Sequence, residues 1–314
     1  MTDYPLVSIL INNHNYEQFL PEAIDSALNQ TYPHTEVIVV DDGSTDKSRE
    51  IIARYGNKII PVFKPNGGQV SAFNTGFATS RGDIICFLDS DDLFFPEKVA
   101  AVVEAFDSSQ DLGWCFHPLK FVDIQLTEIQ GNSSIPQRLH NALVTEYDVR
   151  GNIQRGRLSQ KFPSPSTSGI SLKRSLLELI LPIPEKDQST LLNEAFLIFS
   201  SLGLSRGVVL HLDLGFYRIH GSNANAMTQD KQRLAKICIL HAYWLREKFP
   251  SFANFTHCLM GLGIGVYQAN GGVKKEYQEL VQRYLSSVTL REKLEIYARA
   301  KFQYFKNKLI QLRF

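Results

Sequence analysis

The sequence predicts an α/β fold with a mostly parallel central sheet, flanking helices and a helical C-terminal appendage. Up to residue 112, short apolar runs with strand character alternate with segments whose apolar residues recur at helical spacing. Three of the strands end in polar or acidic clusters, at residues 12–15, 41–42 and 89–92. The carboxyl ends of parallel strands lie along one rim, where ligands bind in such sheets. We therefore expect the three clusters to converge on one site.

Each strand before residue 112 is followed by a helix. Pro21 favours the first turn of a helix, where its missing N–H is not needed. Gly43 permits a tight turn after the second strand, and Ser44, Thr45 or Asp46 can cap the next helix. The expected strands lie at residues 6–11, 36–40, 59–63 and 84–88. Four helices are expected: the first starts near residue 21, the second ends near residue 54, the third covers 70–77 and the fourth covers 99–106.

The pattern becomes less regular between residues 113 and 224. The runs 114–117 and 121–123 are expected to form paired strands. The polar stretch 129–165, which contains glycines and prolines, is expected to form loops over the site. The remaining expected elements are a strand at 168–172, a helix at 175–181, an amphipathic helix at 189–202, and strands at 208–212 and 216–219.

The C-terminal part is expected to be helical. An apolar stripe over residues 234–245 predicts a helix that Pro250 ends, and residues 258–266 are expected to form a packed helix. A last helix begins at Thr289, whose side chain can form a capping box with Glu292.

The last helix combines an apolar face with positive charge. Residues 291–314 contain seven Lys or Arg and two Glu, which gives a local net charge of +5. A basic amphipathic helix can lie on an anionic membrane surface, and it can equally pack on its own domain or on a second subunit. Peripheral membrane contact and a homodimer through these helices therefore both stay open. The apolar face comprises Leu294, Ala298, Phe302, Phe305, Leu309 and Leu312.

Composition narrows the class of protein. The 314 residues are 44% hydrophobic and 21% charged, as in an ordinary globular protein. The formal net charge of +1 argues against nucleic acid as a partner, which would require a basic excess. No signal peptide is evident, and no apolar run approaches the roughly 20 residues of a membrane span, so we expect a cytoplasmic protein. Four widely spaced cysteines follow no metal spacing and are expected to be reduced core residues: Cys86, Cys115, Cys238 and Cys258.

The most informative stretch is the apolar run 84–88, which ends in Asp89, Asp91 and Asp92. Three carboxylates in four positions repel one another, and their burial without a partner is costly. A divalent cation removes this repulsion, and oxygen ligands suit Mg²⁺ or Mn²⁺, which keep positions free for substrate phosphates. We therefore expect a metal–diphosphate site here. The alternative is an acidic turn that caps the helix beginning near Pro96.

Nine short motifs follow one another along the chain: Val7-Ser8-Ile9, Asn15-Tyr16, Asn29-Gln30-Thr31-Tyr32, Val40–Asp46, Asn66-Gly67-Gly68, Asn74-Thr75-Gly76, Arg81-Gly82-Asp83, Leu88–Asp92 and Tyr217-Arg218-Ile219-His220. They resemble, in the expected order, the motifs of family 2 glycosyltransferases. They cover about residues 5–222, and nine in sequence are far more specific than one. The resemblance implies an inverting transferase of the GT-A fold that uses a nucleotide-activated sugar and a divalent metal, Mg²⁺ or Mn²⁺.

The resemblance also divides the chain into domains. It implies a GT-A domain at residues 1–224, with a nucleotide-binding half at 1–112 and an acceptor half at 113–224. The helical appendage then covers residues 225–314. Acceptor choice is expected to depend largely on residues 125–165.

Within the resemblance, several residues gain a role in donor binding. Asp89 and Asp91 form the Asp-x-Asp motif, in which Asp91 is nearest the metal and Asp89 nearest the ribose. Asp42 faces the base and accepts a hydrogen bond from a ring N–H, which suits a UDP- or dTDP-sugar. Its neighbour Asp41 is expected to be structural. The residues expected to bind the nucleotide are Asn12, His14, Asp42, Gly67, Asn74, Asp89 and Arg218.

An inverting transfer also needs a general base to deprotonate the acceptor hydroxyl. The resemblance places this base at the start of a helix that precedes a glycine, where Glu194 fits best and Asp187 is the second choice. The alternative for Glu194 is a solvated position on an amphipathic helix. His220 is expected to ligate the metal together with Asp91 and Asp89, or to contact the diphosphate.

These observations predict a glycosyltransferase that acts on a glycan or lipid-linked acceptor in the synthesis of cell-surface glycans or polysaccharides. It would work in the cytoplasm or peripherally on the cytosolic face of a membrane. A sugar-phosphate nucleotidyltransferase would need a glycine-rich basic loop, which residues 12–15 do not supply. An inactive sugar-nucleotide-binding or scaffold protein, which has lost its base, remains a further alternative. No G-x-G-x-x-G fingerprint follows the first strand, which disfavours a dinucleotide dehydrogenase.

Overall fold

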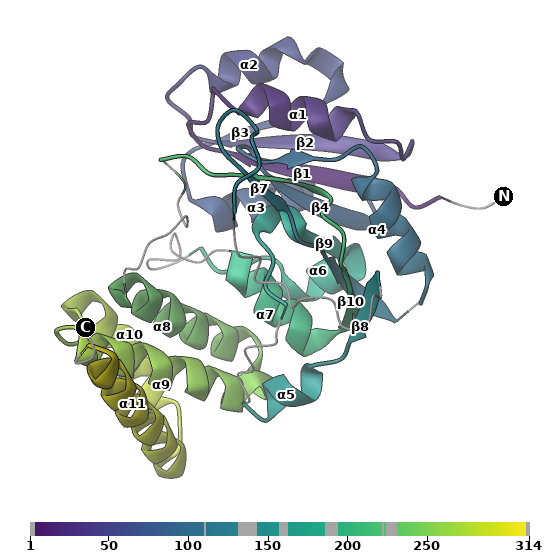
Figure 1. Cartoon of the computed structure of the whole chain (residues 1–314). Coiled ribbons are helices and arrows are strands. Elements are labelled where there is room, and N and C mark those ends of the chain that lie inside the picture. Colours follow the sequence, from purple (N-terminus) through teal and green to yellow (C-terminus); the bar gives the residue numbers. More distant parts are fainter. Residues whose placement is uncertain are drawn as a thin grey trace. The chain divides into compact units, whose positions relative to one another are not determined.

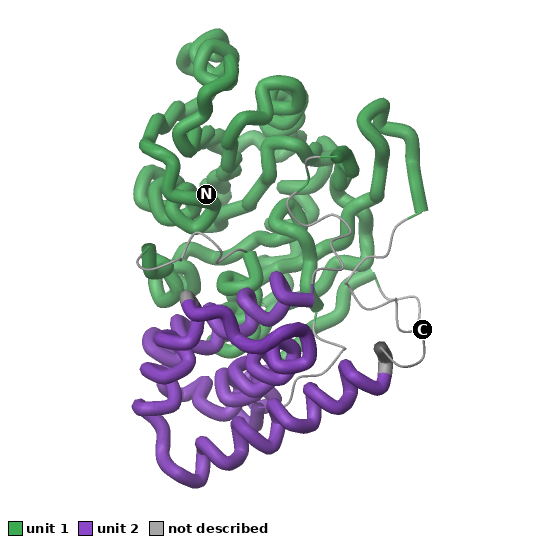
Figure 2. Tube along the Cα trace, turned by 90° about the vertical axis from the view of Figure 1, so that its left-hand side faces the viewer, with its two compact units in different colours: residues 1–148, 161–226 green, residues 149–160, 227–314 purple. Residues whose placement is uncertain are grey.

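The computed structural model separates into two compact units (Figure 2). Unit 1 comprises residues 1–148 and 161–226, and unit 2 comprises residues 149–160 and 227–314. The short segment 149–160 therefore belongs with the C-terminal helices, although unit 1 surrounds it in the sequence. The structure describes residues 4–109, 111–130, 143–156, 163–185, 194–221, 223 and 231–311.

Unit 1 begins with the expected alternation of strands and helices (Figure 1). Each strand and helix predicted before residue 112 is present, with ends shifted by at most two residues. The elements of unit 1 are β1 (Val7–Asn13), α1 (Leu20–Leu28), β2 (Thr35–Asp42), α2 (Ser48–Arg54), β3 (Ile60–Lys64), α3 (Gln69–Thr79), β4 (Ile84–Asp89), β5 (Leu93–Phe94), α4 (Lys98–Asp107), β6 (Leu112–Phe116), β7 (Lys120–Val122), β8 (Val144–Tyr147), β9 (Ile170–Lys173), α6 (Arg174–Ile180), α7 (Glu194–Leu204), β10 (Arg206–Leu210) and β11 (Gly215–Arg218).

The strands form a mixed eight-stranded sheet and a small three-stranded sheet. The large sheet has the order β3-β2-β1-β4-β9-β6-β10-β8, and its first four strands are parallel. Strand β9 runs antiparallel to both β4 and β6. The small sheet has the order β5-β11-β7. The chain winds outward from β1 to β3 and then returns to place β4 on the other side of β1. The point between β1 and β4 is thus a topological switch point, where ligands bind in such sheets.

Helices cover both faces of this parallel region. Ile9 and Ile11 of β1 belong to a buried core that also contains side chains of α1 and α4. On the opposite face, α3 approaches so closely that a Cβ on Gly76 would meet the side chain of Leu10. Successive side chains of β1 therefore reach opposite, buried faces, which explains why this strand is a nearly continuous apolar run.

Two predictions for residues 113–224 are wrong. The runs 114–117 and 121–123 do not pair, because β6 lies between β9 and β10 in the large sheet whereas β7 pairs with β11 in the small one. Pro118, which has no N–H to continue a ladder, follows β6 where the chain leaves the large sheet. The stretch 129–165 is not all loop either: Val144–Tyr147 pairs with β10, and Arg150–Gln154 forms α5 of unit 2.

Unit 2 is helical throughout its described part. Helix α9 is central, since α8 and α11 both pack against it, and residues 258–266 are largely buried within it, as predicted. The predicted capping box is also present: the Thr289 N–H donates to Glu292 Oε2 at 2.7 Å, and the Glu292 N–H donates to Thr289 Oγ1 at 3.3 Å. The helices of unit 2 are α5, α8 (Lys231–Lys248), α9 (Ala253–Ala269), α10 (Lys275–Ser286) and α11 (Leu290–Gln311).

Two further expectations concern the whole chain. All four cysteines are buried and unpaired, as predicted for reduced core residues. Among the described helices, none combines the length and the apolarity that a membrane crossing requires.

The contact of β10 with β6 gives a test of packing. Gly207 lies beside Trp114, and a Cβ at this position would overlap the indole ring and the Trp114 carbonyl oxygen. We expect Gly207→Ala to lower the free energy of unfolding by about 1–3 kcal/mol, because the buried indole cannot move away without strain. Urea unfolding measures this change. Gly221→Ala, which meets no atom within 4 Å, is the control. An unchanged midpoint for Gly207→Ala would contradict the packing.

Candidate active site

The polar ends of β1, β2 and β4 lie side by side. In register, Asn12 of β1 pairs with Val40 of β2 on one side and with Asp89 of β4 on the other. Asn13 pairs with Asp41. The three polar clusters predicted from the sequence therefore do meet at the carboxyl edge of the parallel strands, at the switch point of the sheet.

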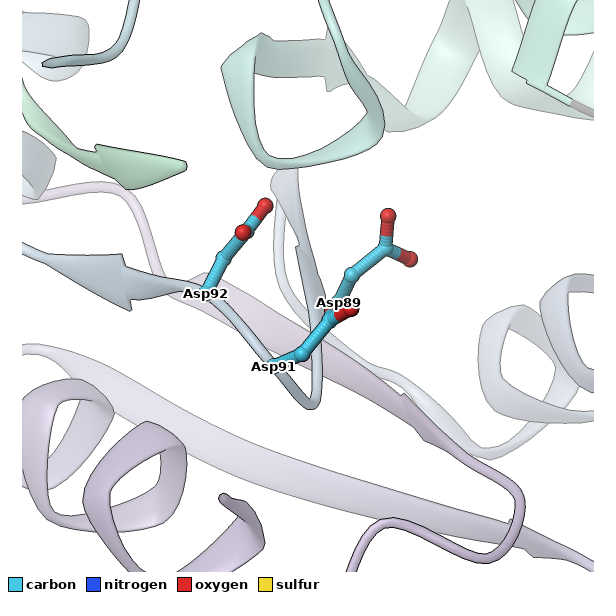
Figure 3. Close-up of side chains that lie close together, drawn as sticks. All are labelled: Asp89, Asp91 and Asp92. Carbon is cyan, nitrogen blue, oxygen red and sulfur yellow. The ribbon is translucent and has the colours of Figure 1, made fainter. Parts of the chain in front are cut away.

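Three carboxylates lie at the end of β4 and on the tight turn that follows it (Figure 3). One oxygen each of Asp89, Asp91 and Asp92 lies within 4.8 Å of the other two. The turn is closed by a hydrogen bond of 3.1 Å from the Asp92 N–H to the Asp89 carbonyl oxygen. Helix α4 begins only at Lys98, and its N-cap residue is Glu97. The alternative in which these acids cap that helix is therefore wrong.

Burial and mutual repulsion raise the pKa of these acids. Burial raises the pKa of Asp89 to about 7, with further contributions from the charges of Asp91 and Glu194. Burial raises the pKa of Asp92 well above its usual value, and the charges of Asp91 and Asp89 raise it further. Without a counter-charge the cluster therefore retains protons near neutral pH, and a divalent cation would compete with those protons.

Asp92 is the most deeply buried of the three acids, and its two oxygens are both hydrogen-bonded. Ser168 Oγ donates to Oδ2 at 2.6 Å, and the Arg218 N–H donates to Oδ1 at 3.0 Å. Ser168 Oγ also accepts the N–H of Asp89 at 3.1 Å. Asp92 thus anchors the turn to the residues before β9 and to β11, and so fixes the position of the other two acids. The resemblance named Asp89 and Asp91 as the Asp-x-Asp pair and predicted no role for Asp92.

The imidazole of His220 lies against Asp91. Its Nε2 is 3.0 Å from Asp91 Oδ2, and Asn223 Nδ2 donates to the same oxygen at 3.3 Å. The aromatic rings of Phe19 and Tyr16 flank the imidazole, with centroids 4.7 and 5.6 Å away. The ring is therefore held in place beside the carboxylate.

This arrangement fits a hard divalent cation. Asp89 and Asp91 offer carboxylate oxygens close enough to converge on one ion, and His220 adds a nitrogen donor beside them. Carboxylate oxygens suit Mg²⁺ or Mn²⁺. Such an ion would supply positive charge for the oxygens of a diphosphate. Asp92 is the acid least available as a ligand, because its oxygens already hold the turn.

Polar side chains from three elements surround Asp89. Its Oδ1 accepts from Asn12 Nδ2 at 3.4 Å and from Gln69 Nε2 at 3.2 Å, and Gln69 Nε2 also lies 3.3 Å from Thr167 Oγ1. Asn12 Oδ1 is buried and has no hydrogen-bond partner within the described part of the chain. A ligand N–H or O–H could therefore bind there. Gln69 was not predicted as a site residue, although it follows directly on a recognised Gly-Gly pair.

Asp42 organises the loop that precedes α3. Its Oδ1 accepts the Gly67 N–H at 2.9 Å, its Oδ2 accepts the Gly68 N–H at 2.7 Å, and Lys64 forms an ion pair with it. Gly68 has a φ of 83°, which favours glycine at this position. A carboxylate has about four lone-pair sites, and the three donors just named occupy three of them, so roughly one remains for a ligand. Lys64 was not predicted as a site residue, although it is the last residue of β3 and other site residues also stand at the ends of their strands.

His14 and Asp41 flank Asp42. His14 Nδ1 lies 2.8 Å from the Asp42 carbonyl oxygen, and Asn66 Nδ2 lies 3.1 Å from His14 Nε2. Asp41 is fully buried, with Arg49 Nε at 2.8 Å from its Oδ2. Asp41 therefore has the environment of a structural acid, whereas His14 is exposed at the rim.

The side chains of Asn74 and Arg218 make their contacts away from the carboxylate cluster, although the backbone N–H of Arg218 donates to Asp92. Asn74 Nδ2 donates to the Ile183 carbonyl at 2.8 Å and to Glu185 Oε1 at 2.6 Å. The guanidinium of Arg218 is buried, pairs with Glu22 and lies 4.7 Å over the ring of Phe19. Both side chains anchor elements of unit 1, and their predicted contact with a nucleotide stays a prediction.

Glu194, the first residue of α7, is half-buried and acts electrostatically on the cluster. Its charge contributes to the raised pKa of Asp89 and of the Tyr217 hydroxyl. Asp187, the second choice for the base, lies outside the described residues. Burial, followed by the charges of the three acids, raises the pKa of Tyr16 and Tyr217. These two tyrosines were not predicted as site residues, although both lie within motifs of the resemblance.

Comparison with known proteins identifies the family. Residues 8–181 match the description "Glycosyl transferase family 2". The chain belongs to this family. It is 35% identical over 221 residues, 69% of its length, to an uncharacterised glycosyltransferase of Nostoc sp.. It is also 42% identical over 118 residues, 37% of its length, to one of Rickettsia typhi. The chain spans less than two thirds of these relatives, with alignments over 66% and 37% of their lengths.

Solved structures share the fold of this family 2 chain. S. aureus TarS 1–349 in complex with UDP-GlcNAc matches with a TM-score of 0.62 at 18% identity, over 96% of this chain and 89% of that one. The mannosyltransferase PcManGT from Pyrobaculum calidifontis in complex with GDP-Man and Mn²⁺ matches with a TM-score of 0.53 at 17% identity, over 98% and 88%. The predicted GT-A fold and the predicted family of glycosyltransferases are both confirmed.

The raised pKa of Asp89 gives a test of the cluster. In the folded chain Asp89 keeps its proton up to about pH 7, whereas in the unfolded chain it ionises near pH 4. The folded state binds more protons in this window, so rising pH favours unfolding. Without divalent metal, wild type should therefore lose stability relative to Asp89→Asn as pH rises from about 4 to about 7.

Urea unfolding in chelator across this pH range measures the difference. Asp107→Asn, which removes an exposed acid of α4, is the control and should follow wild type at every pH. If the free energy of unfolding of Asp89→Asn also changes with pH as that of wild type does, the Asp89 carboxyl does not hold a proton in the folded cluster.

Proposed function

We propose that this chain transfers a sugar, with inversion, from a nucleotide-sugar donor to the hydroxyl of an acceptor. The observation that carries the proposal is the convergence of Asp89, Asp91 and His220 at the switch point of a family 2 sheet. Departure of a nucleoside diphosphate develops negative charge, and a divalent ion at these residues would neutralise it. The Mn²⁺ in the structure of PcManGT supports this choice of cofactor, with Mg²⁺ as the other candidate.

The donor contacts proposed for the nucleotide lie along the same rim. Asn12 offers its buried Oδ1, and Asp42 with Gly67 shapes the loop beside it. The ribose lies near Asp89 and the base near His14 and Asp42. A ring N–H directed at Asp42 favours a uracil or thymine base, and TarS, whose structure holds UDP-GlcNAc, supports a UDP-sugar.

Glu194 is the proposed general base, with Asp187 as the second choice. The charge of Glu194 contributes to the raised pKa of Asp89, which supports a place for its carboxylate near the proposed donor site. Deprotonation of the acceptor hydroxyl opposite the leaving diphosphate gives inversion.

The acceptor is proposed to be a glycan or a lipid-linked precursor of cell-surface polysaccharide, handled in the cytoplasm. In this proposal residues 1–224 form the transferase domain, apart from the segment 149–160, which belongs to unit 2. Residues 1–112 hold the donor, residues 113–224 hold the acceptor, and the helices from 225 onward are an appendage.

Donor binding is the first test. We expect calorimetry to show binding of UDP or dTDP in the presence of Mn²⁺ or Mg²⁺, and its loss in chelator. Asp91→Ala should weaken binding at least about tenfold, because it removes the acid nearest the metal. Asp107→Ala, an exposed acid on α4, should bind as wild type does. If no nucleoside diphosphate binds under any condition, the acidic rim is structural and the proposed transfer is wrong.

The base assignment has its own test. Glu194→Gln should lower kcat by about 10²–10⁴-fold and leave the affinity for the nucleoside diphosphate unchanged, because the acid acts on the acceptor and not on the donor. Asp187→Asn is the parallel variant, and Glu178→Gln, an exposed acid of α6, is the control. A double variant Asp187→Asn/Glu194→Gln with normal turnover would exclude both candidates. Wild type that binds donor but never transfers sugar would indicate an inactive binding protein.

A further inference from the structure

Helix α11 has two apolar faces, and its inner face packs on α9. Ile296 and Ala300 are buried, and their carbonyl oxygens lie where a Cβ on Gly261 or Gly265 would be. Glycine at these two positions lets the helices approach closely. The inner face therefore accounts for the packing of α11 within unit 2.

The outer face of α11 is a row of large apolar side chains exposed to solvent. Between 49% and 74% of each side chain is accessible. Single exposed apolar residues are common, but a contiguous row along one helix marks a surface that binds something. The row consists of Leu290, Leu294, Tyr297, Phe302, Phe305 and Leu309.

Positive charge lies among these apolar side chains. Helix α11 carries six Lys or Arg and two Glu, a net charge of +4. Lys301 is four residues from both Tyr297 and Phe305, so it lies on the same side of the helix. Lys308 follows seven residues later on that side. The outer face is therefore apolar along its length and basic in its C-terminal half.

We propose that the outer face of α11 lies on an anionic lipid surface. Acyl chains near the interface would take up the leucine and phenylalanine side chains, while lysines extend to the phosphate groups. The helix, about 33 Å long, would lie in the plane of the interface. A symmetric contact with a second copy would instead bring together two helices that each carry a net charge of +4, so charge complementarity favours lipid.

This proposal goes beyond the proposed sugar transfer and does not depend on it. It concerns unit 2 alone, whereas the donor and base residues belong to unit 1. Loss of vesicle binding would leave nucleotide binding intact, so failure of one proposal is distinguishable from failure of the other.

The test is co-sedimentation of the full chain with vesicles of phosphatidylcholine alone or mixed with phosphatidylglycerol, at low and raised salt. We expect binding to the anionic vesicles only, weakened by salt. Phe302→Ser/Phe305→Ser and Lys301→Glu/Lys308→Glu should each weaken it at least about tenfold. Because all four positions are exposed or half-buried, these variants should fold, which thermal unfolding checks. The matched control is Leu179→Ser, an equally exposed leucine of α6.

Three outcomes would overturn the proposal. Wild type could fail to bind anionic vesicles, or both double variants could bind as wild type does. Size-exclusion chromatography with light scattering could also show a dimer that Phe302→Ser/Phe305→Ser converts to a monomer, in which case a second copy covers the outer face.

Discussion

The repulsion among three carboxylates at the end of β4 is the constraint on which the arrangement of unit 1 depends. One of them, Asp92, relieves its charge with the Ser168 hydroxyl and the Arg218 N–H. These two partners come from the residues before β9 and from β11, so one buried acid ties the turn to both sheets. By holding β11, it also brings His220 to Asp91. The acid that is least available to a ligand thereby determines where the other two lie.

The acids at the end of β2 and those at the end of β4 have their negative charge balanced in different ways. Asp41 pairs with Arg49, and Asp42 pairs with Lys64 and accepts two loop N–H groups, so the chain itself supplies their counter-charge. For Asp91, the ion-pair partner within the described residues is a histidine, which is charged only when protonated. Negative charge is thus neutralised by the protein at β2 and left for an external cation at β4. This contrast is the strongest physical argument for a metal at one place and a loop anchor at the other.

Much of the parallel half could be predicted from the sequence, because each strand there is a buried apolar run that ends in polar residues. The second half could not, because its pairings join distant segments. Nothing local in Trp114–His117 shows that it continues the large sheet while Phe121–Asp123 joins another. The same holds for the site: Asp89, Asp91 and His220 lie in motifs, whereas Ser168, Asn223 and Gln69 act only through the fold. Lone hydroxyls and amides carry no signal until their partners are known.

For helix α11, too, the spacing of apolar residues in the sequence does not reveal how the element packs. The sequence indicates an apolar face with basic neighbours, but it does not show which face packs on the protein. In the structure Ile296 and Ala300 fill that role against two glycines of α9, so the larger side chains on the other face are not needed for packing. A helix with two apolar faces has a weak amphipathic pattern, since the two faces cancel when averaged around the axis. The exposed apolar face is recognised only after the face that packs on α9 has been assigned.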